Sequence, residues 1–138
     1  IQKLTHITPE LVRDCPAWEE VAPTVGRIIR ATDLFMAHNA EFDSTFLGYE
    51  LLRVGERLSP HTQVFCTMEN GRFATPMGKP PKLIELCRSL GVEFDPEAAH
   101  RAIYDTERMM AALNVGVAKG YFNLDEVVKL IKQYKRGL

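Results

Sequence analysis

The sequence predicts an α/β fold in which short strands pair in parallel and alternate with longer helices. Two observations lead to this class. Residues 34–37 and 63–66 form short runs typical of strands, and the apolar residues around them recur at helical intervals. The first run is apolar throughout, so we expect that strand to be covered on both faces of the sheet.

Helices are expected before the first strand. Thr8 should cap a short helix running to about Cys15, because a proline and a glutamate follow it directly. A second helix should end near Ala31, with Pro23 in its first turn. The apolar stripe of this second helix consists of Val21, Val25, Ile28 and Ile29.

Four further helices are expected after the first strand. The apolar residues of 40–54, which follow that strand directly, recur at mainly helical intervals, and Gly55 should end this helix. Residues 82–90 follow a proline and precede a glycine, which is typical of a helix with both ends marked. Residues 101–118 and 124–134 show the periodicity of two more amphipathic helices.

Two short strands make a small sheet, whose open edges an isolated domain rarely tolerates. The sequence also begins at Ile1 rather than at a methionine. We therefore expect that residues 1–138 are the C-terminal part of a single domain, and that N-terminal strands are missing from this sequence.

Composition and charge limit the classes of function. The chain has 17 basic and 18 acidic residues and a net charge of −1, which argues against coating of long nucleic-acid duplexes. Its three cysteines, Cys15, Cys66 and Cys87, are widely spaced and suggest reduced thiols. No apolar run approaches the length of a membrane span. We expect a soluble, cytoplasmic protein.

The first polar cluster follows the first strand. His38 and Asn39 come directly after it, and Asp43 falls in the first turn of the next helix. The carboxyl ends of strands are where open α/β sheets bind their ligands. The alternative is that Asp43 is simply an acid favoured by the helix dipole.

The second polar cluster lies at the start of the helix at residues 101–118. His100 and Asp105 would be about 140° apart on one ideal helix, so His100 should lie in the preceding loop. Asp105 borders the apolar face on a line with Met109, where a carboxylate is costly to bury without a cation. Alternatively, His100 is an exposed or capping residue and Asp105 pairs with Arg101 or Arg108.

Together these segments resemble the DEDDh family of 3′–5′ exonucleases, which have an RNase H-like fold with a mixed sheet flanked by helices. Residues 38–43 match its second motif, H-N-A-x-F-D, and residues 100–105 match its third, H-x-A-x-x-D. Residues 4–8 look like the H-x-I-T segment of the same family. The form of the third motif is similar to that of the branches containing exonuclease X and the epsilon proofreading subunit of bacterial DNA polymerase III.

The resemblance implies a two-metal phosphodiesterase that trims 3′ ends, with DNA favoured over RNA. It makes Asp43 and Asp105 two of four carboxylates that hold two Mg²⁺ or Mn²⁺ ions, and His100 the general base. His38 and Asn39 would hold the terminal nucleotide, or else close the strand end structurally. The implied partners are single-stranded DNA and a polymerase or a second copy of the chain.

One part of the family pattern is absent. The first motif, D-x-E on the first strand, should precede residue 38, and nothing in residues 1–36 supplies it. Residues 95–97 have the right letters in the wrong place, so we do not count them. Without this pair we expect the chain alone to be nearly inactive. A binding module that keeps the exonuclease fold, or an unrelated α/β domain, are the alternative hypotheses.

Overall fold

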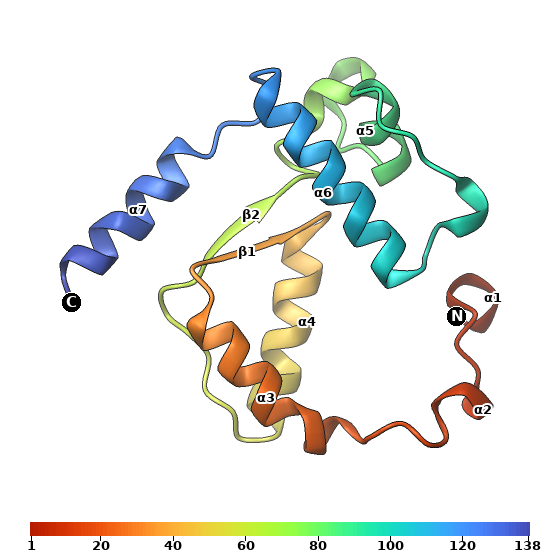
Figure 1. The fold of residues 1–138 in the computed structure, drawn as a ribbon, viewed down its shortest axis with the longest axis vertical. Helices are drawn as coiled ribbons and strands as arrows, with labels where there is room; N and C mark the ends of the chain where they lie inside the picture. Colours follow the sequence, from red (N-terminus) through yellow and green to blue (C-terminus); the bar gives the residue numbers. More distant parts are fainter.

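A computed structural model describes all of residues 1–138 and confirms the predicted α/β class (Figure 1). Its helices lie around one small sheet. In chain order the elements are α1 (Gln2–Thr5), α2 (Pro9–Val12), α3 (Trp18–Ala31), β1 (Leu34–Ala37), α4 (Ala40–Arg53), β2 (Gln63–Cys66), the 3₁₀ turns η1 (Arg72–Ala74) and η2 (Pro76–Gly78), α5 (Leu83–Ser89), the 3₁₀ turn η3 (Pro96–Ala98), α6 (Ala102–Ala118) and α7 (Asp125–Arg136).

The sheet consists of β1 and β2, which pair in parallel from Leu34 opposite Gln63 to Ala37 opposite Cys66. Both strands have the predicted bounds. The expectation that β1 is covered on both faces is wrong, because all four of its residues are only half-buried. The physical reason is that β1 has one strand neighbour, so its other edge is open. The antiparallel part of a mixed sheet is not represented in residues 1–138.

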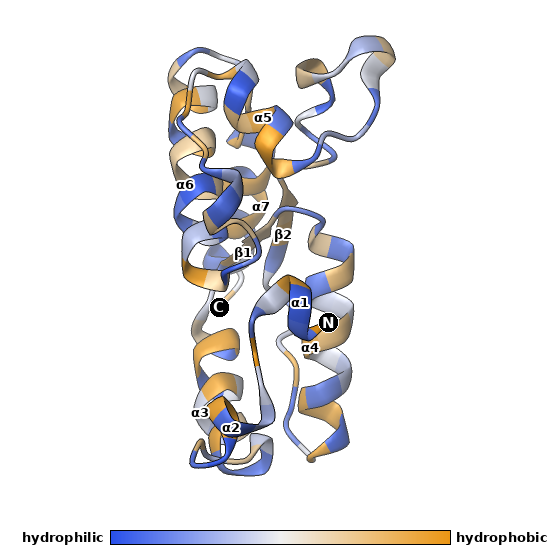
Figure 2. Ribbon diagram, turned by 90° about the vertical axis from the view of Figure 1, so that its right-hand side faces the viewer, coloured by the Kyte–Doolittle hydropathy of each residue, from blue (hydrophilic) through white to orange (hydrophobic).

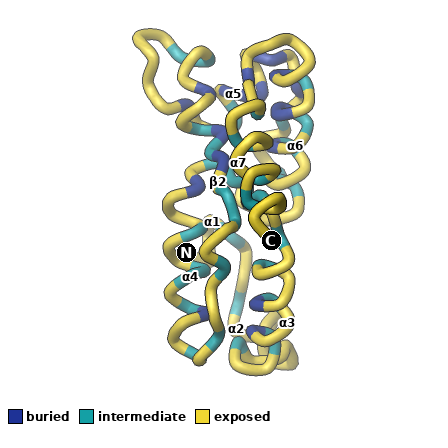
Figure 3. The backbone as a smooth tube through the Cα atoms, turned by 90° about the vertical axis from the view of Figure 1, so that its left-hand side faces the viewer, coloured by how far each residue is buried: buried dark blue, intermediate teal, exposed yellow.

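The hydrophobic core lies between β2, α5 and α6, where the buried positions concentrate (Figure 3). The Phe65 ring meets the Phe122 ring edge to face, with centroids 5.9 Å apart. Gly116 lets α6 approach this ring, since a Cβ there would lie 2.3 Å from a Phe122 carbon. This packing fixes α6, whose first turn carries Asp105.

The helix α4 packs against the sheet and is linked to α3 by a hydrogen bond of 3.0 Å from Trp18 Nε1 to the Glu50 carbonyl. Its other side exposes apolar residues, which recur along the helix in Figure 2. We call Phe42, Phe46 and Tyr49 the aromatic stripe; each is more than 60% exposed. The stripe has no covering element within the chain.

Two predictions about the N-terminal helices are wrong in detail. The Thr8 hydroxyl caps α2 as expected, but α2 ends at Val12 rather than near Cys15. Pro16 explains this, because it disfavours helical geometry at Cys15 and has no N–H to bond to the Val12 carbonyl four residues before it. Pro23 lies in the second turn of α3, since that helix already begins at Trp18. The short helix α1 and the 3₁₀ turns were not predicted, and α1 and α2 bury no residue.

The remaining helices match their predicted ranges to within two residues. The helix α7 lies beside the amino ends of the strands, where the Tyr134 ring stacks on His61 and Lys135 pairs with Asp33. All three cysteines are free. No helix is both long enough and apolar enough to cross a membrane.

Candidate functional site

An open pocket of about 990 Å³ lies at the carboxyl end of β1. It is lined by β1, the start of α4, the start of α5, the η3 loop and the first half of α6. The structure brings together in this pocket every residue predicted for the site: His38, Asn39, Asp43, His100 and Asp105. The two sequence motifs therefore face one space.

His38 is fixed by both of its ring nitrogens. Nε2 lies 2.9 Å from the Pro81 carbonyl and Nδ1 lies 3.0 Å from the Thr67 hydroxyl. Burial lowers the pKa of His38, while the bond to Pro81 and the charge of Asp105 oppose this shift. Because a carbonyl oxygen only accepts, the neutral ring donates from Nε2 and accepts from Thr67. His38 thus ties together the ends of both strands and the segment before α5.

Asn39 and Asp43 present their side chains differently from His38. Asn39 is exposed, adopts a left-handed backbone with φ 76°, and makes no side-chain capping bond to α4. Asp43 is exposed as a residue, yet partial burial of its carboxyl group raises its pKa. A hydrogen bond from its own backbone partly offsets this shift. Both side chains are free to contact a bound molecule.

Asp105 anchors the loop that carries His100. Its carboxylate accepts the His100 backbone N–H, at 3.1 Å to Oδ2 and 3.3 Å to Oδ1. His100 lies before α6, as predicted, and has a left-handed backbone with φ 65°. For a residue other than glycine this conformation is unfavourable by about 1 kcal/mol or more, so the anchor maintains it.

The His100 ring is exposed and has no hydrogen-bond partner within the chain, although its backbone is held. The alternative pairing of Asp105 with Arg101 or Arg108 does not occur, since neither arginine forms a salt bridge. Arg108 instead donates to the Glu93 carbonyl. The pocket therefore contains an unengaged imidazole next to a carboxylate that is not neutralised by a protein cation.

The donor set fits part of a divalent-cation site. Asp43 and Asp105 offer the hard carboxylate oxygens that Mg²⁺ and Mn²⁺ prefer. No group of three or more His, Cys, Asp or Glu side chains anywhere in the chain is placed to hold a metal. Asp95, the first residue of the D-x-E letters at 95–97, caps the η3 turn by accepting the Glu97 N–H at 2.9 Å. Two carboxylates are thus the whole ligand set that these residues provide.

Sequence reasoning missed the partners of His38. Thr67 is fully buried and directly follows β2, just as His38 directly follows β1. Since parallel strands end at the same edge of a sheet, this matched spacing was a usable signal. No comparable signal in the sequence pointed to the Pro81 carbonyl as the second partner of His38. Nothing in the sequence indicated that Cys66 lies next to the second motif, where its sulfur accepts the Ala40 N–H at 3.4 Å.

Comparison with known proteins gives a family match over most of the chain. The family model described as Exonuclease matches residues 1–113, which include both motifs and every pocket residue. The final part of α6 and all of α7 lie beyond the matched range.

The curated relatives include PolC-type DNA polymerases III. The chain is 36% identical over 107 residues to that of Bacillus subtilis, covering 78% of this chain and 7% of the relative. It is 32% identical over 144 residues to that of Bacillus cereus, covering 99% of this chain and 10% of the relative. With the enzyme of Staphylococcus haemolyticus the identity is 41% over 111 residues, or 78% and 7% of the two chains.

The chain therefore spans about a tenth or less of the length of these relatives. No solved structure gives a significant match.

Proposed function

Since this chain belongs to the Exonuclease family, a family of nucleases, we propose that it hydrolyses phosphodiester bonds at the 3′ ends of nucleic acids, with DNA as the favoured substrate. One observation carries the proposal: the pocket joins two carboxylates and an unengaged histidine from motifs far apart in the sequence. This combination provides cation ligands and a base in one place.

Asp43 and Asp105 are the proposed cation ligands, for Mg²⁺ or Mn²⁺. When bound, such ions activate water for attack and offset charge on the phosphate and the leaving oxygen. The carboxylates supply hard oxygen donors, and the raised pKa of Asp43 is the expected property of a carboxylate whose surroundings favour the neutral form until a cation arrives. Further carboxylates would be needed to complete a two-metal site.

His100 is the proposed general base. A ring nitrogen of His100 takes the proton from the attacking water, and its exposed, unpaired ring is free to do so. Asp105 holds the His100 backbone rather than its ring, so the imidazole can turn toward the substrate. Histidine suits this role because its ordinary titration lies near neutral pH.

Asn39 is the proposed contact to the terminal nucleotide, since its side chain is exposed in the pocket. The role of His38 is better described as structural. Both of its ring nitrogens are already engaged by Thr67 and Pro81. A nucleotide would therefore meet only the carbon edge or face of the ring.

We also propose that residues 1–138 form the C-terminal part of a single exonuclease domain, whose sheet continues past β1. The open edge of β1 supports this, because an unpaired strand edge needs a partner or a cover. The aromatic stripe on α4 supports it independently, since three exposed aromatic side chains along one helix are unusual on the surface of a complete domain. The missing D-x-E carboxylates would belong to these added strands.

The relatives that the chain resembles are named PolC-type DNA polymerases III. The proposed partners are accordingly a single-stranded DNA 3′ end and a polymerase or a second copy of the chain, in the cytoplasm.

A second candidate is a catalytically inactive module of the same fold that binds nucleic acid or a partner protein. The lack of any group of three metal-ligating side chains favours this candidate. It shares the pocket with the first proposal but predicts binding without cleavage.

The test is cleavage of single-stranded DNA with Mg²⁺ by the chain extended with the proposed N-terminal strands and their D-x-E pair, because residues 1–138 contain no group of three side chains placed to hold a metal. A label at the 5′ end makes shortening from the 3′ end appear as a ladder. His100→Ala should lower the rate by roughly 10²- to 10⁴-fold while binding is kept. His61→Ala is the matched control, because His61 lies before β2 at the far end of the sheet and outside the pocket.

Loss of cleavage in His100→Ala alone supports the exonuclease. An extended chain that binds DNA but never shortens it, with or without His100, supports the inactive module. A chain with no affinity for nucleic acid contradicts both.

A further inference from the structure

The pocket has a single lysine or arginine in its lining, Lys82. The two carboxylates Asp43 and Asp105 line the same space. A site that receives a phosphate backbone needs positive charge beyond any cations that those carboxylates hold. Lys82 is the one permanently charged basic side chain that the chain provides there.

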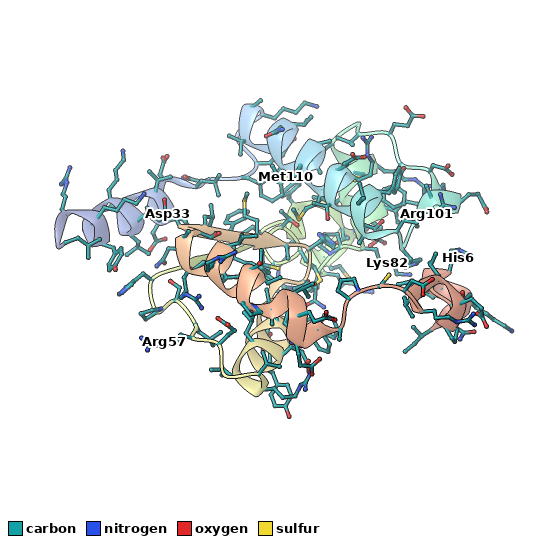
Figure 4. The ribbon with its side chains drawn as sticks, turned by 60° about the horizontal axis from the view of Figure 1, so that its bottom comes forward. His6, Asp33, Arg57, Lys82, Arg101 and Met110 are labelled. Carbon is teal, nitrogen blue, oxygen red and sulfur yellow. The ribbon has the colours of Figure 1, made fainter.

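The Lys82 ammonium is not used by the protein. The five salt bridges of the chain involve Arg30, Arg53, Arg72 and Lys135, and none involves Lys82. Its side chain makes no hydrogen bond, and the residue is exposed. Figure 4 shows Lys82 on the same side of the molecule as Arg101, which precedes α6.

The backbone at Lys82 is held firmly, in contrast to its free side chain. Its N–H donates to Glu85 Oε2 at 2.6 Å and its carbonyl accepts the Leu86 N–H at 3.0 Å. Pro81 just before it is fully buried, and the Pro81 carbonyl is the acceptor of the His38 bond. His38 therefore fixes the base from which the lysine side chain reaches into the pocket.

An exposed lysine is usually a solvated surface charge. Three features separate Lys82 from that case: it lines the same pocket as both candidate cation ligands, its ammonium group forms no salt bridge, and its backbone is tied to the strand ends through His38. A flexible stem on a fixed base lets a point charge follow a flexible strand.

We infer that Lys82 binds a backbone phosphate of the nucleic-acid strand held in the pocket. The inference rests on the proposed function and adds to it a residue outside both motifs. Lys82 acts here by binding and positioning the strand, while the cation ligands and His100 act at the reacting bond.

The test measures binding of a 5′-fluorescein-labelled single-stranded DNA by anisotropy over a range of salt concentrations, with Ca²⁺ in place of Mg²⁺ to prevent cleavage. Lys82→Ala should weaken binding roughly three- to tenfold at low salt and reduce the slope of log K against log salt by about 0.7, as expected for one lost phosphate contact on a single strand. Lys82→Arg should restore both values.

Lys79→Ala is the matched control, because Lys79 belongs to the same Lys-Pro-Pro-Lys run but does not line the pocket. In the cleavage assay, Lys82→Ala should raise KM with kcat nearly kept. Wild-type binding with an unchanged Lys82→Ala variant, or an equal loss in Lys79→Ala, overturns the Lys82 inference alone. A wild-type chain that does not bind the labelled strand overturns the proposed function together with it.

Discussion

The two histidines of the pocket occur in similar motifs but are held in opposite ways. His38 is engaged at both ring nitrogens, and its ring joins three segments of the fold. His100 is held only by its backbone, in a left-handed conformation, and its ring is free. A histidine in a motif can therefore build the site or perform chemistry in it, and the hydrogen bonds of its ring tell which.

The largest expected effect concerns the carboxylate that holds the free histidine. Asp105→Asn keeps an oxygen to accept the His100 N–H but removes the charge that a cation needs. Cleavage should fall by about 10³-fold, because a cation contributes several kcal/mol to the transition state. The measurement is the initial rate of cleavage of single-stranded DNA by the chain extended with the proposed N-terminal strands.

Asp95→Asn is the matched control, since Asp95 caps the neighbouring η3 turn and an asparagine can do the same. Equal loss of cleavage in both variants would contradict the assignment of Asp105 as a cation ligand.

The next effect separates the two histidines by stability. His38→Ala should lower the free energy of unfolding by about 2 to 4 kcal/mol, because the buried Thr67 hydroxyl and the Pro81 carbonyl each lose a partner. His100→Ala should change it by no more than about 0.5 kcal/mol. Urea denaturation followed by circular dichroism measures both. Similar losses in the two variants would contradict the different roles assigned to His38 and His100.

The lowered pKa of His38 predicts a pH dependence of stability. Because burial disfavours the charged ring, the unfolded chain takes up a proton at a higher pH than the folded chain does. The His38 contribution is thus fully present above the ordinary histidine pKa of about 6.5 and declines as the pH falls below it. Urea midpoints between pH 7.5 and 5.5 should show this decline, and it should be weaker in His38→Gln.

The smallest effect is a gain in stability. His100→Gly places at φ 65° the residue that adopts this conformation most easily, so the free energy of unfolding should rise by up to about 1 kcal/mol. The same change removes the proposed base. A variant that is more stable but inactive would show that the His100 backbone is maintained for function, whereas a loss of stability would contradict the strain.

Much of this arrangement was predictable from the sequence. The bounds of β1 and β2 followed from short runs, and the position of His100 before α6 followed from helical geometry. The convergence of residues 38–43 and 100–105 on one pocket followed from their resemblance to a family, since spacing alone cannot bring them together. The role of His38 was left open, because it depends on Pro81, whose carbonyl carries no signal in the side-chain pattern. The half-burial of β1 could not be predicted, because an apolar run shows only that a strand can be buried. It does not show whether a second strand lies at its other edge.

The aromatic stripe also affects how the purified chain will behave. Exposed rings on α4 together with an open strand edge form an aggregation-prone surface. Copies of the chain should therefore associate as the protein concentration rises, and the solubility should be lower than the ordinary composition suggests. A hydrophobic fluorescent dye should bind to the folded chain at this surface. Replacing Phe46 with lysine should reduce the dye signal and improve recovery, so one exposed ring controls how easily the molecule can be handled.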